Sequence, residues 1–328
     1  MRTEEAQKRG VDDGCYDTYI MDMNTSTYQS GEPATPGSYG EAPAGFRLPD
    51  DTRLGRVRLR VSDLTRSLSF YEEFLGFRVL RKGEGFAELG ARDDDRVLVE
   101  LNEQRGISAA AQRGRLGLYH FAILLPDRGS LGRFIFYAGK LGVRLGSADH
   151  LVSEALYLRD PDGLGIEIYA DRPRDTWRRV GREILMAADP LDLQGLLSEA
   201  GDGNWPGMPA GTVIGHAHLH VGDLQQARTF YSDAVGFDVM TASYPGALFL
   251  GAGGYHHHLG TNVWAGDGAR PTRADEAGLI EWTIELPDRA SVAAAADSIS
   301  AAGYAVTRAN DEAVTTDPWG TAVRLRIS

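Results

Sequence analysis

The chain has 328 residues, of which 42% are hydrophobic and 24% charged, a composition typical of a soluble globular protein. Its net charge of −12 argues against binding of nucleic acid, and no apolar stretch approaches the ~20 residues that cross a bilayer. A single cysteine, Cys15, excludes a disulfide framework, a cysteine-rich zinc site and an iron–sulfur cluster. With no signal peptide evident, we expect a cytoplasmic protein whose metal ligands, if any, are His, Asp or Glu.

Composition divides the chain into four stretches. The first is rich in Gly, Pro, Ser and Thr and lacks hydrophobic periodicity, which predicts a flexible N-terminal tail over residues 1–50. A second Gly/Pro-rich break, EAGDGNWPGMPAG, closes a connector over residues 173–211. These breaks predict two domains of similar length, at residues 51–172 and 212–328.

The two predicted domains repeat one plan. RVRLRVSDL begins at Arg56 and HAHLHVGDL at His216, and each is followed by FY and by a GF motif. Both copies also contain an LPDR turn and then DPDG or DPWG. Ordered matches over this length indicate an internal duplication. Pairs offset by 160 residues (221 − 61, 236 − 76) are Val61 with Val221, Asp63 with Asp223, Tyr71 with Tyr231, and Gly76 with Gly236.

Within each copy a smaller unit occurs twice. It begins with an alternating strand, continues through an Asp-containing turn into a helix, and ends with two or three more strands. In the first unit, Arg56–Val61 alternates polar with apolar residues, and Leu64, Leu68, Tyr71 and Leu75 follow at helical spacing. The sequence therefore predicts an α+β protein of four βαβββ modules. Asp63 and Asp223 are predicted helix N-caps, and Tyr71 and Tyr231 are predicted core residues.

All eight histidines lie outside the first and fourth modules. In HAHLHV, strict alternation puts His216, His218 and His220 on one face of a strand, with apolar residues on the other. His120 in YHFAIL and Glu167 in GIEIY are likewise expected to point away from the packed side. An inward carboxylate is costly unless it is paired or binds a cation. The alternative is an exposed sheet face with solvated side chains.

These motifs resemble a known family. The strand–DL–FY–GF repeat, the LPDR turns and DPDGLGIE resemble the vicinal oxygen chelate superfamily, which includes glyoxalases, bleomycin-resistance proteins and extradiol dioxygenases. GLYHFAILLPDR, SEALYLRDPDGLGIEIYADRPRDTW, IGHAHLHVGDL and AGGYHHHLG are together similar to the two-domain catechol 2,3-dioxygenases of the CatE type. The resemblance covers residues 52–328 and implies two tandem domains whose four modules form two open eight-stranded cups.

The resemblance also implies a metal site. Family members take ligands from the first strand of a module and from its last strand. In this chain the first-strand positions are occupied by Arg56, His120, His216 and Glu281, and last-strand positions by Glu167 and Arg324. Neither copy alone completes a triad, but His120, Glu167 and His216 together make the two-histidine, one-carboxylate set that holds Fe(II). This requires the second and third modules to share one cup, within a chain or across a dimer.

Further roles follow from the same resemblance. His257 in the HHH run corresponds to the acid–base histidine, with His256 and His258 pointing the other way along a strand. Tyr157, ten residues before Glu167, corresponds to the substrate-positioning tyrosine, and His150 to a further catalytic histidine. His218 and His256 are candidate substrate-binding residues. In the alternative interpretation, His218 and His220 only line the cup, while His256 and His258 pack or meet solvent on the other face of the sheet.

The function implied is that of a non-haem Fe(II) extradiol dioxygenase, with Mn(II) as the alternative metal. Its substrates would be a small aromatic diol and O2, and the product a muconic semialdehyde-type acid. We expect a homo-oligomer with no nucleic acid or membrane partner. Two alternatives stay open: a glyoxalase-type isomerase or lyase, and a metal-free small-molecule binding protein. Arg56 and Arg324, at lost ligand positions, are expected to form salt bridges.

Overall fold

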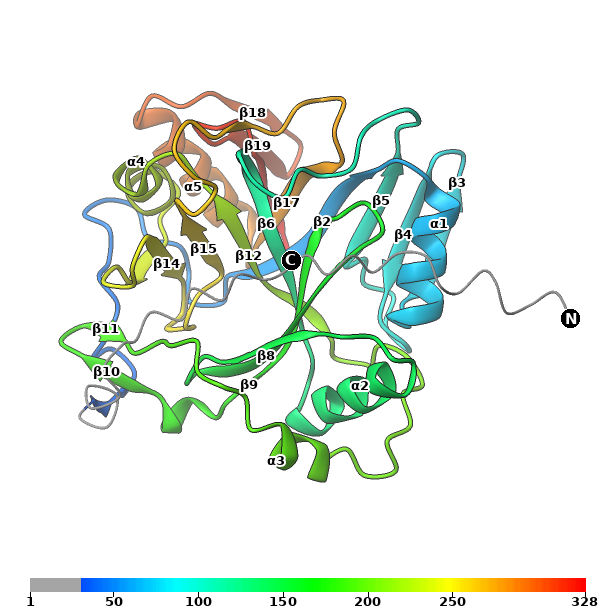
Figure 1. Ribbon diagram of the computed structural model, residues 1–328. Helices are drawn as coiled ribbons and strands as arrows, with labels where there is room; N and C mark the ends of the chain where they lie inside the picture. Colours follow the sequence, from blue (N-terminus) through cyan, green and yellow to red (C-terminus); the bar gives the residue numbers. More distant parts are fainter. Residues whose placement is uncertain (1–30) are drawn as a thin grey trace, which may run out of the picture. The chain divides into compact units, whose positions relative to one another are not determined.

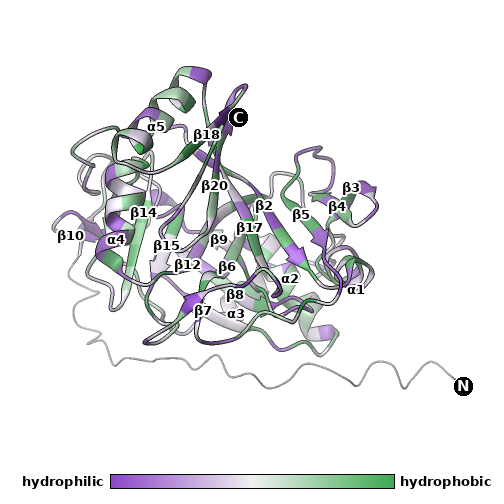
Figure 2. Ribbon diagram, turned by 90° about the horizontal axis from the view of Figure 1, so that it is seen from above, coloured by the Kyte–Doolittle hydropathy of each residue, from purple (hydrophilic) through white to green (hydrophobic). Residues whose placement is uncertain are grey.

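The structure is a computed structural model and describes residues 31–328. Strands in which buried and exposed residues alternate build its two large sheets. In β2 (Arg53–Val61), Val57, Leu59 and Val61 are buried, whereas the arginines between them are partly exposed. Figure 2 shows this alternation of hydrophilic and hydrophobic residues along β2. Such a period of two gives each sheet one face for the helices and another for polar side chains.

The second and third modules form one sheet. Its strand order is β13-β14-β15-β12-β6-β9-β8-β7, and the short β16 (Arg270–Pro271) pairs with β6 outside this path. The antiparallel pairing of β6 with β12 joins the two modules within one chain. The strands are β6 (Arg115–Leu124), β7 (Gly146–Asp149), β8 (Ser153–Arg159), β9 (Gly165–Asp171), β12 (Val213–His220), β13 (Asp238–Thr241), β14 (Ala247–Gly251) and β15 (Leu259–Asn262).

The first and fourth modules form the other sheet, in the order β18-β19-β20-β17-β2-β5-β4-β3. Here β2 pairs antiparallel with β17, again within one chain. The two sheets confirm the predicted α+β fold with tandem domains and eight-stranded cups, and the modules pair as two-with-three and one-with-four. The remaining strands are β3 (Arg78–Gly83), β4 (Phe86–Gly90), β5 (Val99–Glu103), β17 (Gly278–Leu286), β18 (Val306–Ala309), β19 (Glu312–Thr316) and β20 (Ala322–Ile327).

Helices cover the outer faces of the sheets, while β2, β6, β12 and β17 converge near the middle (Figure 1). An aspartate caps the first helix of every module by accepting a backbone N–H three residues on, as predicted for Asp63 and Asp223. The helices are α1 (Leu64–Leu68) with the π-helical η2 (Ser69–Phe74), α2 (Arg128–Lys140), the 3-10 turn η3 (Arg174–Thr176), α3 (Leu193–Ser198), α4 (Leu224–Arg228) with η4 (Thr229–Ala234), and α5 (Arg289–Ala301).

Two buried tyrosines link the modules of each copy. The Tyr71 hydroxyl donates to Asp160 of the DPDG turn at 3.2 Å, and the Tyr231 hydroxyl donates to Asp317 of the DPWG turn at 2.8 Å. Both tyrosines are fully buried in the main core, as predicted. The duplicated motifs therefore serve the fold, each pinning a helix of one module to the last-strand turn of the next.

Residues 31–50 differ from the predicted flexible tail. Leu48 is buried in the main core, Arg47 forms an ion pair with Asp238, and β1 (Glu32–Pro33) pairs with β10 (Arg178–Val180), which in turn pairs with β11 (Glu183–Ile184). This stretch is anchored by single side chains and backbone bonds, so it has no periodic sequence signature. Residues 1–30, including Cys15, lie outside the described residues. No helix of the described part of the chain is long and apolar enough to cross a membrane.

Candidate metal centre

Three strands of the sheet formed by the second and third modules, here called the two-three sheet, carry the predicted ligands side by side. His120 lies on β6, Glu167 on β9 and His216 on β12. Ala122 of β6 is the register partner of both Glu167 and His216, so all three side chains share one face. Because Ala122 ends at its β-carbon, the longer side chains on either side can converge above it.

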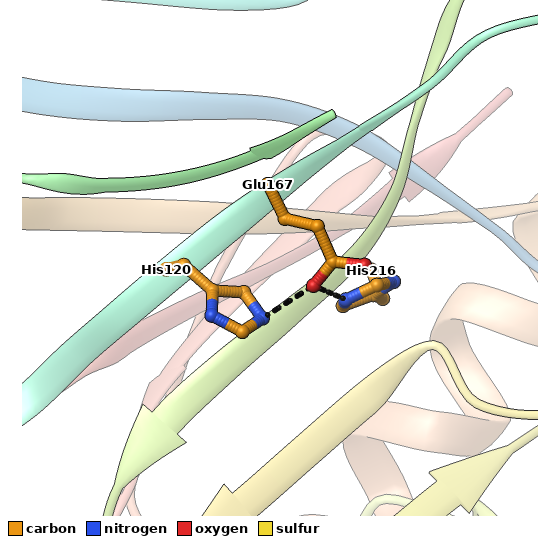
Figure 3. Close-up of side chains that lie close together, drawn as sticks. All are labelled: His120, Glu167 and His216. Carbon is orange, nitrogen blue, oxygen red and sulfur yellow. Dashed lines mark hydrogen bonds and ion pairs between the residues drawn. The ribbon is translucent and has the colours of Figure 1, made fainter. Parts of the chain in front are cut away.

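The three side chains meet at one oxygen atom. Oε2 of Glu167 lies 3.0 Å from Nε2 of His120 and 3.3 Å from Nε2 of His216. Dashed lines mark both contacts in Figure 3. The possible ligand atoms of all three lie within 4.8 Å of one another, and each side chain is buried. His120 Nε2 is buried and finds no hydrogen-bond partner of good geometry within residues 31–328. This convergent set of N and O donors, one of them orphaned, fits a divalent cation.

The electrostatics of the centre suit a cation as well. Burial lowers the pKa of His120, and although Glu167 partly offsets this, the net direction is downward. Burial by itself would raise the pKa of Glu167, but His216 and His120 outweigh it and hold that pKa well below its usual value. A neutral imidazole and an ionised carboxylate are the protonation states that bind metals.

A β-bulge sets the direction of His216. In the pairing of β12 with β6, the register shifts between Ile214 and His216, which leaves Gly215 unpaired. A β-carbon at Gly215 would lie 1.8 Å from the Tyr169 hydroxyl oxygen, so only glycine fits there. Bulges redirect the neighbouring side chain, and here the redirected residue is the ligand candidate from the third module.

The HHH run does not lie on a strand, so the predicted alternation of His256, His257 and His258 is wrong. The positive φ angles of Gly253 and Gly254 turn the chain, and β15 begins only at Leu259. His257 lies over His216, with ring centroids 4.2 Å apart, while His256 lies behind it and contacts Trp177. Burial, followed by the neighbouring histidines, holds the pKa of His257 well below its usual value.

Tyr157 and His150 form a hydrogen-bonded pair at the edge of the centre. Tyr157 is the register partner of Glu167, and its ring centroid lies 5.6 Å from that of His120. His150 places Nδ1 2.5 Å from the Ala187 carbonyl oxygen and Nε2 2.5 Å from the Tyr157 hydroxyl. Because a carbonyl only accepts, Nδ1 carries a hydrogen, and in the neutral imidazole Nε2 then accepts from the Tyr157 hydroxyl.

His218 and His220 are joined through Asn262. His220 Nδ1 donates to Asn262 Oδ1 at 2.6 Å, and Asn262 Nδ2 donates to His218 Nε2 at 3.0 Å. His218 is the register partner of His120, and their ring centroids lie 4.9 Å apart. Burial lowers the pKa of His220 to about 4 and that of His218 well below its usual value. His218 therefore lines the cup beside the ligand candidates as a neutral side chain.

The sheet formed by the first and fourth modules, here called the one-four sheet, has ion pairs at the corresponding positions. Arg324 donates to both carboxylate oxygens of Glu281, at 2.7 and 2.9 Å. Arg56 and Arg58 both approach Glu100, at 3.3 and 3.0 Å. These are the salt bridges expected for Arg56 and Arg324. Within the described residues, no group of metal-ligating side chains like that of the two-three sheet forms here.

Two residues at the site were not singled out from the sequence. Asp171 accepts a hydrogen bond from His256, and Asn262 bridges His218 and His220. Asp171 could have been found, because it lies four residues after Glu167 on the same strand and so shares its face. Asn262 has no such signal, since its role depends on the parallel pairing of β12 with β15.

Comparison with known proteins gives a consistent result. A sequence model of the Glyoxalase/Bleomycin resistance protein/Dioxygenase superfamily matches residues 53–168 and 213–324. The chain is 46% identical over 273 residues to a catechol-2,3-dioxygenase of Bacillus subtilis, covering 82% of this chain and 95% of that protein.

Solved structures share the fold at low identity. A structure from Bacillus subtilis aligns with a TM-score of 0.59 at 12% identity, covering 86% of each chain. A glyoxalase I variant from Zea mays aligns with a TM-score of 0.51 at 20% identity, covering 84% of this chain and 92% of that one. At these identities the likeness speaks for the fold alone.

Proposed function

Because the chain belongs to the Glyoxalase/Bleomycin resistance protein/Dioxygenase superfamily, we propose that it is an extradiol dioxygenase that opens a catechol ring with O2. The observation that carries the proposal is the buried donor set of His120, Glu167 and His216, built between the second and third modules. The 46% identity to a catechol-2,3-dioxygenase supports it. In the reaction, one ring C–C bond beside the two hydroxyls breaks and both atoms of O2 enter a muconic semialdehyde-type product.

His120, Glu167 and His216 would hold Fe(II), with Mn(II) as the alternative. The bound ion would supply positive charge that lowers the pKa of a catechol hydroxyl, and open positions for substrate and O2. The three side chains are proposed ligands because their donor atoms converge. The corresponding face of the one-four sheet instead carries Arg324 and Arg56, each paired with a carboxylate.

The remaining residues are proposed to handle protons and orientation. His257 lies beside His216 and would take a proton from the substrate and return it during cleavage. The Tyr157 hydroxyl, held by His150, would orient a substrate oxygen. His218, held by Asn262, would line the substrate side of the cup. His120, His216, His218 and His257 are buried, and exclusion of water from the centre would strengthen these polar interactions.

The test is oxygen uptake matched to metal content. Protein purified without oxygen is loaded with Fe(II) or Mn(II), and catechol is added under controlled O2. We expect about one metal per chain and one O2 consumed for each catechol opened. Stoichiometric binding of catechol without oxygen uptake would overturn the proposal in favour of a binding protein. Isomerisation of a methylglyoxal–glutathione hemithioacetal, without ring opening, would favour a glyoxalase.

A further inference from the structure

The sequence suggested a substrate contact for His256, but the structure encloses this residue. Its side chain is fully buried, and its ring packs between Tyr255 and Trp177, with centroids 4.1 and 5.3 Å away. Both ring nitrogens have partners: Nε2 lies 2.9 Å from Oδ1 of Asp171, and Nδ1 lies 2.8 Å from Nδ1 of His257. A chain of hydrogen bonds therefore runs from Asp171 through His256 to His257.

With Asp171 ionised and His256 neutral, these groups allow only one direction for the hydrogen bonds. An ionised carboxylate only accepts, so His256 Nε2 carries a hydrogen and donates it to Asp171. In a neutral imidazole the other nitrogen is then an acceptor, so His256 Nδ1 accepts from His257 Nδ1. This leaves His257 Nε2 without a hydrogen. It is this nitrogen that a proton-accepting histidine needs free.

We propose that Asp171 and His256 are positioning residues that orient His257 and select its tautomer with a hydrogen on Nδ1. The inference rests on the proposed function, in which His257 transfers a proton. It replaces the substrate contact predicted for His256. A carboxylate that orients a histidine, here through a second histidine, is a known way to prepare a neutral imidazole for its task.

Local structure holds this relay, the hydrogen-bonded series of Asp171, His256 and His257, in place from both ends. Asp171 is the last residue of β9, on the same face as Glu167, so the strand that carries a ligand candidate also carries the carboxylate. The turn before the histidines is anchored by Tyr39, whose hydroxyl donates to the Gly254 carbonyl oxygen at 2.9 Å. Asp171 Oδ1 also accepts from the Tyr255 hydroxyl at 3.2 Å, which provides a matched control.

The first test reads the tautomer directly. Full-length protein with 15N-labelled histidine is loaded with diamagnetic Zn(II), and two-bond proton–nitrogen correlations assign the hydrogen on each ring. We expect His257 to carry it on Nδ1, and His256→Phe to shift His257 toward the Nε2–H form that an isolated side chain favours. A hydrogen on Nε2 of His257 in the unaltered protein would overturn the inference.

The second test uses kinetics and a double variant. In the Fe(II)-loaded enzyme, Asp171→Asn and His256→Phe should each lower kcat about 10–100-fold, with metal content and KM for catechol nearly unchanged. Because both act through one chain of bonds, the double variant should be no slower than His256→Phe alone. Tyr255→Phe, which removes the other donor to Asp171 and a hydrogen-bond partner of the Tyr169 hydroxyl but keeps the His256–His257 bond, should leave kcat within about twofold. Additive losses, or an equal loss in Tyr255→Phe, would contradict the relay.

The two tests separate this inference from the proposed function. If the protein consumes no oxygen with catechol, the proposed function fails, and the tautomer measurement still decides whether Asp171 and His256 set the state of His257. If His256→Phe does not fold, Asp171→Asn carries both tests, because the Asp171 side chain is 28% exposed and its replacement is nearly isosteric.

Discussion

The two sheets of this protein share one strand plan and solve the same electrostatic problem in different ways. Each buries a carboxylate on the polar face of its central strands: Glu167 in the two-three sheet and Glu281 in the one-four sheet. Glu281 is neutralised by the guanidinium of Arg324, which is charged at every relevant pH. Glu167 instead faces His120 and His216, and burial favours the neutral form of His120.

This difference shows how duplication separates two roles. A buried carboxylate without a permanent cation is costly, and a metal ion removes that cost. A carboxylate already paired with arginine has no need of a metal and contributes to the fold instead. Different residues at three matching strand positions thus separate a candidate centre from a structural ion-pair network: Arg56, Glu281 and Arg324 correspond to His216, His120 and Glu167.

The largest expected effect comes from removing a ligand candidate. His216→Ala should reduce bound iron from about one per chain to nearly none and abolish catechol-dependent oxygen uptake, because two donors do not retain the ion. Metal analysis beside turnover measures this. The matched control is Arg56→Ala at the corresponding position of the first module, where Arg58 still pairs with Glu100, and it should retain both iron and activity. Iron retained in His216→Ala would contradict the proposed ligand set.

A smaller loss is expected from removing the proposed proton-transfer group. His257→Phe should keep iron and catechol binding but slow ring opening about 10²–10⁴-fold, the usual contribution of a positioned acid–base group. Single-turnover rates at saturating catechol separate this effect from binding. Full activity would exclude His257 from the mechanism, and loss of iron would instead make it a ligand.

In the one-four sheet the expected effect is on stability. Arg324→Ala leaves Glu281 buried with Arg58 3.8 Å away, and should cost about 2 kcal/mol in the free energy of unfolding, less than a fully unpaired buried charge. Replacing both residues by methionine should recover most of that loss. Urea denaturation measures both variants. Iron content should not change in either, and a loss of iron would mean that the two sheets are not independent.

The smallest effect concerns the contact between the sheets. Arg115 at the start of β6 donates to both oxygens of Glu276, just before β17, and holds the pKa of Glu276 at about 2, below its ordinary 4.5. Because this pKa is lowered on folding, the stabilisation is present above pH ~4.5 and is lost as the pH falls toward 2. Glu276→Gln should cost ~0.5–1 kcal/mol at pH 7 and flatten the acid dependence of unfolding. An unchanged acid profile would contradict this role.

Much of the fold was predictable because it is written in local patterns. The repeat, the alternating strands and the aspartate caps all depend on residues close in sequence. The shared face of His216, His218 and His220 also depends on neighbouring residues, because all three lie on one strand. The pairing of module two with module three followed from the distribution of possible ligands. Metal binding itself and the roles of these side chains stay predictions.

What the sequence did not reveal depends on contacts distant in the chain. Leu48 and Tyr39 anchor residues 31–50 against Gly236 and Gly254, which lie 188 (236 − 48) and 215 residues away, and no local pattern signals such contacts. In sequence the HHH run is compatible with an alternating strand, but two glycines, Gly253 and Gly254, precede it. Their left-handed conformation ends the regular backbone, so His256 turns inward toward Asp171.

Modules two and three, which form one sheet, lie in sequence between modules one and four, which form the other. This order has a consequence for synthesis of the chain. All strands on the main path of the two-three sheet lie within residues 115–262, so this sheet can pair as soon as that stretch has left the ribosome. The edge of β2, by contrast, waits for β17, more than 200 residues later. Late closure over so long a separation is slow and leaves a strand edge open to other chains. The one-four sheet, which has ion pairs in place of the candidate metal ligands, is therefore the sheet more exposed to misassembly during folding.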